Sequence, residues 1–298
     1  MDWWLLLWYF ILSGGSEWGL YLLLSGASVF TGIIASMLGV GGGFLNVPLI
    51  EYIANERINV AIGTSLFIIM FTSFSATIEY ARNRAIDFKL GLLLAVASIP
   101  GAFLGAYLTG WIQEGILKIF FGVTLVVVGF SMIFRNRKNS VSPQETLKKD
   151  TKSVTGSILS WKRVIKLVNG ENYEYFVNLP LGLAFSFVAG LTSGLLGIGG
   201  GIIQVPVLNV ALGVPMIITV ATSMFIIVLT SLVGSFEHFM LGQANWQIGV
   251  VMMIGAVIGA QIGVRLTLKL APNLLKKIFG LALILIAIQM IYEALISL

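Results

Sequence analysis

The sequence predicts an all-α polytopic membrane protein: an inverted repeat of two halves, each with a glycine-broken helical hairpin plus three transmembrane helices, and a small cytoplasmic β-hairpin between the halves. Three observations support this fold class. Hydrophobic residues make up 57% of the chain and charged residues only 10%. The segment GVGGGFLNVP at residues 39–48 recurs as GIGGGIIQVP at residues 197–206. Basic residues are concentrated in a few of the connections between apolar stretches.

The internal repeat has a constant offset of 158 residues, counted from Gly39 to Gly197. The same offset relates the pairs Thr64 and Thr222, Ser65 and Ser223, Glu79 and Glu237, and Gly101 and Gly259. Residues 24–134 and 182–292 are therefore two copies of one unit. The chain divides into an N-terminal segment (1–23), a first transmembrane repeat (24–134), a linker (135–177) and a second transmembrane repeat (178–298).

Hydrophobic stretches and turn residues predict five helical pieces in each repeat. Those of the first repeat are 22–38, 44–54, 59–80, 88–110 and 115–134. Those of the second repeat are 179–196, 202–212, 216–240, 246–268 and 272–297. The second piece of each set is too short to cross a bilayer core of about 30 Å at about 1.5 Å per residue. We expect these two pieces to stop near mid-membrane or to cross obliquely.

Two further segments flank or separate the repeats. Residues 3–12 are apolar but few, and the turn-like SGGSE follows at residues 13–17. They fit an interfacial anchor or part of an interrupted span better than a secretory signal, because the basic start of a signal is missing. In the linker, a polar stretch at 136–156 precedes RVIKLV and ENYEYFV, which surround Asn169-Gly170. This pattern predicts a β-hairpin with a type I′ turn.

The distribution of charge orients the chain. Residues 135–177 carry nine lysines and arginines against four acids, and basic residues also mark the connections near Arg84 and Arg265. These segments should be cytoplasmic in a multi-pass protein of the cell (inner) membrane. The basic connection at 82–89 aligns, by the offset, with the uncharged connection at 240–247. Equivalent loops then lie on opposite sides, which predicts an inverted repeat.

Composition excludes several functional classes. The chain has no cysteine and one histidine, so no thiolate site, disulfide or histidine metal cluster is expected, and we expect no cofactor. The net charge of +5 is explained by topology signals rather than by nucleic-acid binding. Catalytic and nucleotide-binding motifs are missing, so we expect a protein that is not an enzyme and that uses a gradient or passive transport.

The glycine triplets are the candidate binding site for a small anionic substrate. Each triplet lets the backbone leave its helix, and the short helix that follows presents free N–H groups and a positive dipole end. Small-residue helix packing is the alternative role for these glycines. Neighbouring hydroxyls and amides either contact the same ligand or bond to the backbone. The candidate residues are Gly41, Gly42, Gly43, Asn46, Thr64, Ser65, Gly199, Gly200, Gly201, Gln204, Thr222 and Ser223.

Three titratable residues are candidates for proton coupling: Glu79, its repeat partner Glu237, and the adjacent His238. The alternative is that the glutamates sit at helix ends, satisfied by water or by neighbours such as Arg82. A cation-coupled transporter of a neutral or other small solute is the second functional hypothesis. A cation site would favour nearby carboxylates, however, and no aspartate lies in a predicted span.

The motifs GASVFTGIIASMLGVGGGFLNVPLI and AIGTSLFIIMFTS, with their second copies GLLGIGGGIIQVPVL and VATSMFIIVLTS, resemble the sulfite exporter family TauE/SafE. The resemblance extends from about Ser25 to Leu298. It implies an internally duplicated transporter, and an exporter of sulfite, sulfoacetate or a similar small organosulfur anion. The helix-dipole argument leads to an anion independently; the oligomeric state stays open.

Overall fold

The computed structural model describes residues 17–112, 160–168, 170 and 172–268, together with the single positions 116, 119, 123, 126, 288 and 292. Within these residues the protein is mostly helical with one two-stranded antiparallel sheet. Six helices in the described part of the chain are long and apolar enough to cross a membrane. The predictions for residues 1–16, 115–134, 136–156 and 272–297 lie outside the described residues, apart from the single positions named above.

Four helices of the first half follow the predicted order. They are α2 (Glu17–Leu38), α3 (Gly43–Ile53), α4 (Ile58–Arg82) and α5 (Phe88–Thr109). Helix α2 begins at Glu17, five residues before the predicted start, so the last residue of SGGSE is helical. An acidic residue is favourable at the start of a helix because of the helix dipole. The Asp87 side chain caps α5 by accepting a hydrogen bond from the Leu90 N–H.

The second half repeats this order with one local difference. It contains α7 (Leu179–Leu196), α8 (Gly201–Pro206), η1 (Val207–Ala211), α9 (Met216–Met240) and α10 (Trp246–Thr267). The single short helix of the first half is here an α-helical turn that continues as a π-helix after Pro206. The Asn245 side chain caps α10, as Asp87 caps α5.

The linker forms the predicted β-hairpin, with β1 (Ser160–Lys166) antiparallel to β2 (Asn172–Asn178). The predicted two-residue turn is wrong, because Lys166 pairs with Asn172 and this register gives a loop with an odd number of residues. The Gly170 N–H bonds to the Leu167 carbonyl, and Gly170 adopts the left-handed φ of 87°. A turn followed by a left-handed glycine is the usual geometry of such odd loops.

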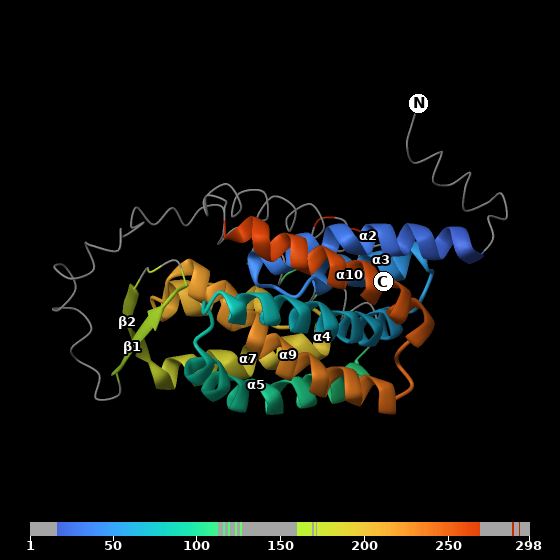
Figure 1. The fold of residues 1–298 in the computed structure, drawn as a ribbon. Helices are drawn as coiled ribbons and strands as arrows, with labels where there is room; N and C mark the ends of the chain where they lie inside the picture. The colour runs from blue at the N-terminus through green and yellow to red at the C-terminus, as the bar shows by residue number, and fades with distance from the viewer. Residues whose placement is uncertain are drawn as a thin grey trace.

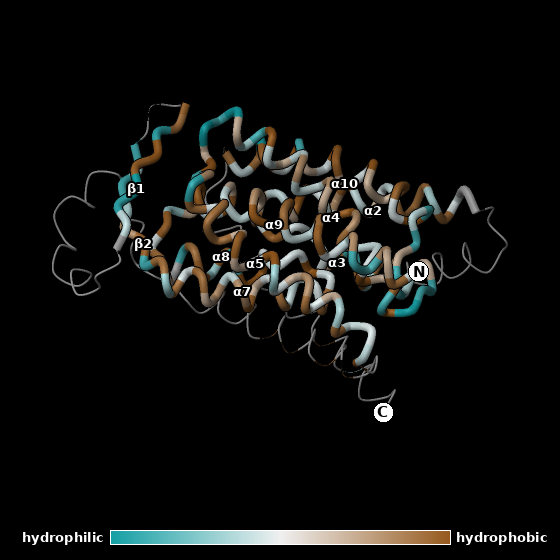
Figure 2. The backbone as a smooth tube through the Cα atoms, turned by 90° about the horizontal axis from the view of Figure 1, so that it is seen from below, coloured by the Kyte–Doolittle hydropathy of each residue, from teal (hydrophilic) through white to brown (hydrophobic). Residues whose placement is uncertain are grey.

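The long helices form three layers in Figure 1, with α2 and α10 on one side, α4 and α9 in the middle, and α5 and α7 on the other. The first helix of each half therefore packs on the last described helix of the other half. Helices α4 and α9 pack against each other, and each also contacts an outer helix, α10 or α5. The hairpin lies at one end of this bundle (Figure 1). Polar residues are concentrated in the hairpin and in connections between the helices, whereas the helices are mainly apolar (Figure 2).

Glycines allow the outer helices to approach closely. A Cβ on Gly105 would lie 2.1 Å from the Leu191 carbonyl oxygen on α7. Its repeat partner Gly263 would meet the Ile33 carbonyl of α2 at 2.3 Å. Both contacts are with backbone, which side-chain rotation cannot relieve. These glycines therefore set the spacing of two equivalent helix pairs.

Substitution of these contact glycines tests the packing. We expect Gly105→Ala or Gly263→Ala to lower the free energy of unfolding by about 1–3 kcal/mol, because the added methyl group must separate two helices. Gly26→Ala is the matched control: Gly26 is also helical but has nothing within 4 Å of its Cβ position, so alanine should be neutral or slightly stabilising there. The measurement is the thermal unfolding midpoint in detergent. Equal midpoints for all three variants would contradict the packing.

Candidate functional site

The two glycine breaks have the backbone conformation that their sequence predicts. In the first break Gly39, Gly41 and Gly42 have φ values of 73°, 86° and 93°. In the second, Gly197, Gly199 and Gly200 have φ values of 68°, 75° and 74°. Residues with a Cβ rarely adopt this left-handed region, so glycine is required at each position. Gly42 and Gly200 are the N-caps of α3 and α8, and neither helix start has a side-chain cap.

The structure brings the two breaks into contact. A Cβ on Gly43 would lie 2.1 Å from the Gly197 carbonyl oxygen, and one on Gly201 would lie 2.6 Å from the Gly39 carbonyl oxygen. Segments separated by about half the chain thus meet through backbone. No side chain larger than hydrogen fits at either position without moving the other break.

The contact lies at the middle of the two central helices. A Cβ on either Gly41 or Gly199 would be 3.0 Å from Cγ2 of Ile69 and 3.2 Å from Cγ2 of Ile227. Ile69 follows the start of α4 by eleven residues, and Ile227 follows the start of α9 by eleven residues, in helices of 25 residues each. Both helices are long enough to span a bilayer, so the breaks meet near mid-span.

Two serines from the central helices hold the breaks. The Ser65 hydroxyl on α4 donates to the Gly197 carbonyl over 2.8 Å. The Ser223 hydroxyl on α9 donates to the Gly39 carbonyl over 2.7 Å. Each half therefore supplies the donor for a carbonyl that the break of the other half has released. Both serine side chains are buried and use these bonds within the protein.

The neighbouring threonines hold the loops that lead into α5 and α10. Thr64 accepts a hydrogen bond from the Asn245 N–H at 2.8 Å, and Thr222 accepts one from the Asp87 N–H at 3.0 Å. The four predicted residues with hydroxyl side chains thus divide into two pairs. The two serines bond to the breaks, and the two threonines bond to the loops. Ligand contact by Thr64, Ser65, Thr222 and Ser223 stays a prediction.

The two amides in the first turns of the short helices are buried. The Asn46 Oδ1 accepts a bond from the Thr31 hydroxyl at 2.9 Å, and the Gln204 Nε2 donates to the Ser186 hydroxyl at 3.0 Å. The Gln204 Oε1 is buried without a hydrogen-bond partner. Exchange of the two isosteric amide atoms would let Oε1 accept from Ser186 and would leave an N–H donor free instead. Gln204 can therefore offer either an acceptor or a donor.

Ser193 is a polar residue near the second break that sequence comparison missed. Its hydroxyl is buried without a partner, and its Cβ lies 3.3 Å from the Cβ position of Gly200. The repeat offset gives no signal for it, because the equivalent residue is Ala35. A free hydroxyl beside Gly200 adds a neutral donor to this side of the breaks.

The three proton-coupling candidates are not brought together with the breaks. Glu79 lies within 3.3 Å of Arg82 and 3.8 Å of Arg265, both exposed at the helix ends. Its partner Glu237 is half-buried near the end of α9. His238 lies 3.0 Å from both the Gly194 carbonyl, through Nε2, and the Gln243 amide oxygen, through Nδ1.

His238 occupies the position that Tyr80 has in the first half. The Tyr80 hydroxyl donates to the Ser36 carbonyl at 2.8 Å, and Ser36 is the repeat partner of Gly194. Both side chains thus tie the end of a central helix to the outer helix that precedes a break. Proton coupling by Glu79, Glu237 or His238 stays a prediction.

A buried ion pair joins the hairpin to the helices, and sequence reasoning missed it. The Asp87 carboxylate accepts hydrogen bonds from Arg163 Nε at 2.7 Å, from Arg163 Nη2 and from the Tyr175 hydroxyl at 2.7 Å. Arg163 also lies over the Trp161 ring, 4.4 Å from its centroid. The available signal was the helix-capping position of Asp87 and of its repeat partner Asn245.

The protonation states of this cluster follow from its geometry. Burial by itself raises the pKa of the Asp87 carboxyl, but the bonds from Arg163, Tyr175 and the Leu90 N–H outweigh it and hold the pKa below its usual value. Burial and the adjacent carboxylate raise the pKa of the Tyr175 hydroxyl. The hydrogen bonds to Asp87 raise the pKa of Arg163. At neutral pH the cluster therefore holds an ionised pair and a protonated tyrosine.

The serine bonds to the breaks can be tested by stability. Ser65→Ala or Ser223→Ala removes the donor to a buried carbonyl and should lower the free energy of unfolding by about 1–3 kcal/mol. Ser231→Ala is the matched control, because this serine is equally buried on α9 but bonds to the carbonyl of Ile227 in its own helix. The control should lose less than about 1 kcal/mol. Thermal unfolding in detergent checks the difference, and equal losses at all three sites would contradict the cross-half bonds.

The chain is similar to known membrane transporter proteins. Residues 24–290 match the family described as sulfite exporter TauE/SafE. The probable membrane transporter protein YunE of Bacillus subtilis is 31% identical over 284 residues, covering 93% of this chain and 99% of that protein. The sulfite exporter TauE/SafE family protein 6 of Arabidopsis thaliana is 23% identical over 306 residues, covering 78% of this chain and 71% of that protein. No solved structure matches. Because the family pattern extends over nearly the whole chain, the chain belongs to the sulfite exporter TauE/SafE family.

Proposed function

We propose that the protein is a secondary transporter of a small anion, with sulfite and small organosulfonates as the substrate class. Membership of the sulfite exporter family supports a transporter, and the contact of the two glycine breaks at mid-span is the observation that carries the proposed site. We further propose the direction of export, the cell (inner) membrane, and a cytoplasmic position for the hairpin. The cytoplasmic position is supported by Arg84, which lies beside Ala85 in the loop that the hairpin covers. Basic residues in short connections mark the cytoplasmic side.

The chemistry around the breaks suits an anion. The atoms nearest the Cβ positions of the break glycines belong to backbone groups and neutral side chains, among them Asn46, Ser193 and Ser223. None of these neighbours in the described part of the chain is a carboxylate. Helix α3, which begins at the first break, directs the positive end of its dipole toward the contact region. Backbone N–H groups and neutral donors bind a small anion without fixing a full positive charge in the membrane.

Alternating access fits the way the halves are joined. Each outer layer combines helices of both halves, α2 with α10 and α5 with α7, around the central α4 and α9. The two short segments lead to opposite ends: Glu56, after α3, bonds to Asn245, whereas Leu212, after η1, packs in one cluster with Val177 of the hairpin. This arrangement supports an inverted repeat. Relative movement of the two halves would expose the contact of the breaks to one side at a time.

A change of charge at Gln204 tests the proposal and separates it from cation transport. The experiment is a thermal-shift panel on the purified protein with sulfite, sulfate, thiosulfate, sulfoacetate, taurine and lactate at matched ionic strength, followed by flux in proteoliposomes. We expect saturable stabilisation by at least one organosulfur anion or sulfite. Gln204→Glu should weaken the binding of that anion about tenfold or more, because it places a negative charge beside the breaks. Gln204→Met, of similar volume, should weaken it much less.

Two outcomes would contradict the anion proposal. One is stabilisation by Na⁺ or a neutral solute alone, which would favour the cation-coupled transporter. The other is unchanged anion affinity in a folded Gln204→Glu protein. A further pair of variants separates the site from backbone strain. Gly200→Ala and Gly213→Ala introduce alanine at φ values of 74° and 72°, but Gly213 has open space around its Cβ position. Only Gly200→Ala should impair anion binding.

Proton coupling is tested by replacing the titratable groups with their non-titrating equivalents. Coupling through these residues predicts that Glu237→Gln and His238→Tyr flatten the pH dependence of transport between about pH 5 and pH 8. Tyrosine is chosen because Tyr80 holds the equivalent position in the first half. A tyrosine hydroxyl in place of His238 can donate to the Gly194 carbonyl. Flux in proteoliposomes at a series of pH values is the measurement. A wild-type pH profile in both folded variants would overturn the coupling hypothesis.

A further inference from the structure

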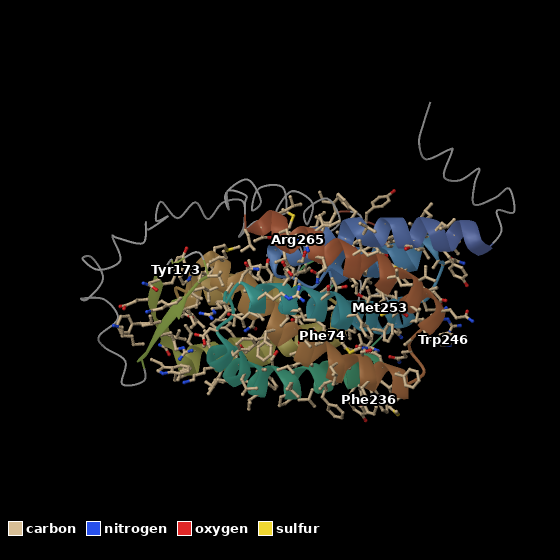
Figure 3. All side chains as sticks on the ribbon, viewed as in Figure 1. Phe74, Tyr173, Phe236, Trp246, Met253 and Arg265 are labelled. Atoms are coloured by element: carbon tan, nitrogen blue, oxygen red, sulfur yellow. The ribbon has the colours of Figure 1, made fainter. Side chains whose placement is uncertain are left out.

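The loops that precede α5 and α10 are repeat partners, but the structure holds them differently. Ala85, Ile86 and Asp87 of the first loop are all buried, and the Asp87 side chain is 0% exposed. The equivalent residues of the second loop, 243–245, are only half-buried. Figure 3 shows Tyr173 of the hairpin and Trp246, next to Asn245, at opposite ends of the bundle. One end of the molecule is therefore closed more completely than the other.

Ala85 and Ile86 pack with residues of α4, α9 and α10. At Asp87 the difference comes from the hairpin, which has no counterpart in the repeat. At its end, the loop supplies a carboxylate, Asp87, and the hairpin supplies both Arg163 and Tyr175 as donors. At the other end, the loop supplies the neutral amide of Asn245, which donates to Glu56 at 2.7 Å. The first loop is thus held by a buried ionised pair with a third hydrogen bond. The second loop is held by the bond of Asn245 to Glu56 and by the contact of Gln243 with His238. The two ends differ in charge as well as in burial.

The Asp87 loop is also linked to a glycine break. The Asp87 N–H bonds to the Thr222 hydroxyl on α9, and the next residue, Ser223, donates to the Gly39 carbonyl. The hairpin makes its own contact with the same region, since the Val168 N–H bonds to the Asn83 carbonyl at 3.3 Å, after the end of α4. The loop and the break therefore share one segment of α9, and the hairpin is bonded to that loop.

We propose that Asp87 is a positioning residue for transport, and that Arg163 and Tyr175 clamp it so that the hairpin keeps its end of the pathway closed. Opening of this end requires the loop to leave both α9 and the hairpin, which breaks the Thr222 bond and the Arg163 and Tyr175 bonds to Asp87. The opposite loop, held through Asn245 and Glu56, opens with fewer bonds lost. The hairpin thereby biases the alternation of the two halves. This inference rests on the proposed alternating access at the breaks.

Single-cysteine labelling tests the clamp, and the cysteine-free chain provides a clean background. The reporter is Ala85→Cys, a fully buried position in the clamped loop, and the reporter for the opposite end is Ala244→Cys. Purified protein in detergent is treated with a maleimide, and the labelling rate is measured. Asp87→Asn, which copies the residue of the other loop, and Arg163→Gln should each raise the rate at the Ala85 reporter about fivefold or more. The rate at the Ala244 reporter should not increase.

The matched control is Lys162→Gln, which removes an exposed ion pair with Glu174 (3.0 Å) in the same hairpin. It should leave both rates unchanged. A variant that only loosens the fold would raise the labelling rates at both reporters together. Such a joint rise would overturn the proposal, and so would equal rates in Arg163→Gln and Lys162→Gln. Tyr175→Phe removes one bond and keeps the ion pair, so it provides a milder variant where Asp87→Asn does not fold. It should give an intermediate rate at the Ala85 reporter.

Flux in proteoliposomes connects the clamp to transport. We expect Arg163→Gln to change the maximal rate at least about twofold while the affinity from thermal shift stays within about twofold, because the ion pair does not touch the breaks. Equal maximal rates in Arg163→Gln and the wild type would contradict the positioning role. Labelling needs no substrate, so it still tests the clamp if none of the anions binds. In that case the proposed function fails separately from the clamp.

Discussion

A backbone that leaves its helix in the middle of a membrane span must find new hydrogen-bond partners, and this requirement organises the protein. A carbonyl without a partner costs several kcal/mol in an apolar environment. Here the carbonyls of Gly39 and Gly197 receive the hydroxyls of Ser223 and Ser65. Each break is thus stabilised by a central helix of the other half. The two halves therefore depend on each other at the breaks, in keeping with their interleaved packing.

Glycine serves two physical purposes in this arrangement. At the breaks it permits left-handed φ values and lets two backbones touch, as the contact between Gly43 and the Gly197 carbonyl shows. Along the outer helices, residues such as Gly105 and Gly263 permit close packing of helices from different halves. The second use is common in membrane proteins, where small residues replace hydrophobic burial as the source of helix association. The first use leaves a central region lined by backbone and neutral groups, which is the basis of the proposed anion site.

The hairpin breaks the equivalence of the two halves. It covers the loop at Asp87 with an arginine and a tyrosine, and it packs on the cluster formed by Leu208, Leu212 and Val214. A buried carboxylate is stable only when it is paired and hydrogen-bonded, so the loop and the hairpin depend on each other. A transporter with two equivalent loops would have no intrinsic preference between its two sides. In the clamp that we propose, the hairpin at one end supplies such a preference.

The sequence alone determined the helical membrane architecture, the position of the breaks and the presence of the hairpin. Hydrophobicity, glycine triplets and strand-forming residues are local signals, and each of them acts within a short stretch of chain. The hairpin turn differed because strand register depends on the pairing of residues in space. Only the tertiary structure decided that Ser65 and Ser223 cross between the halves, that His238 and Tyr80 bond to equivalent positions of the outer helices, and that Asp87 pairs with Arg163. These contacts join residues distant in sequence, and Arg163 belongs to a segment outside the repeat, so neither periodicity nor the 158-residue offset could reveal its partner.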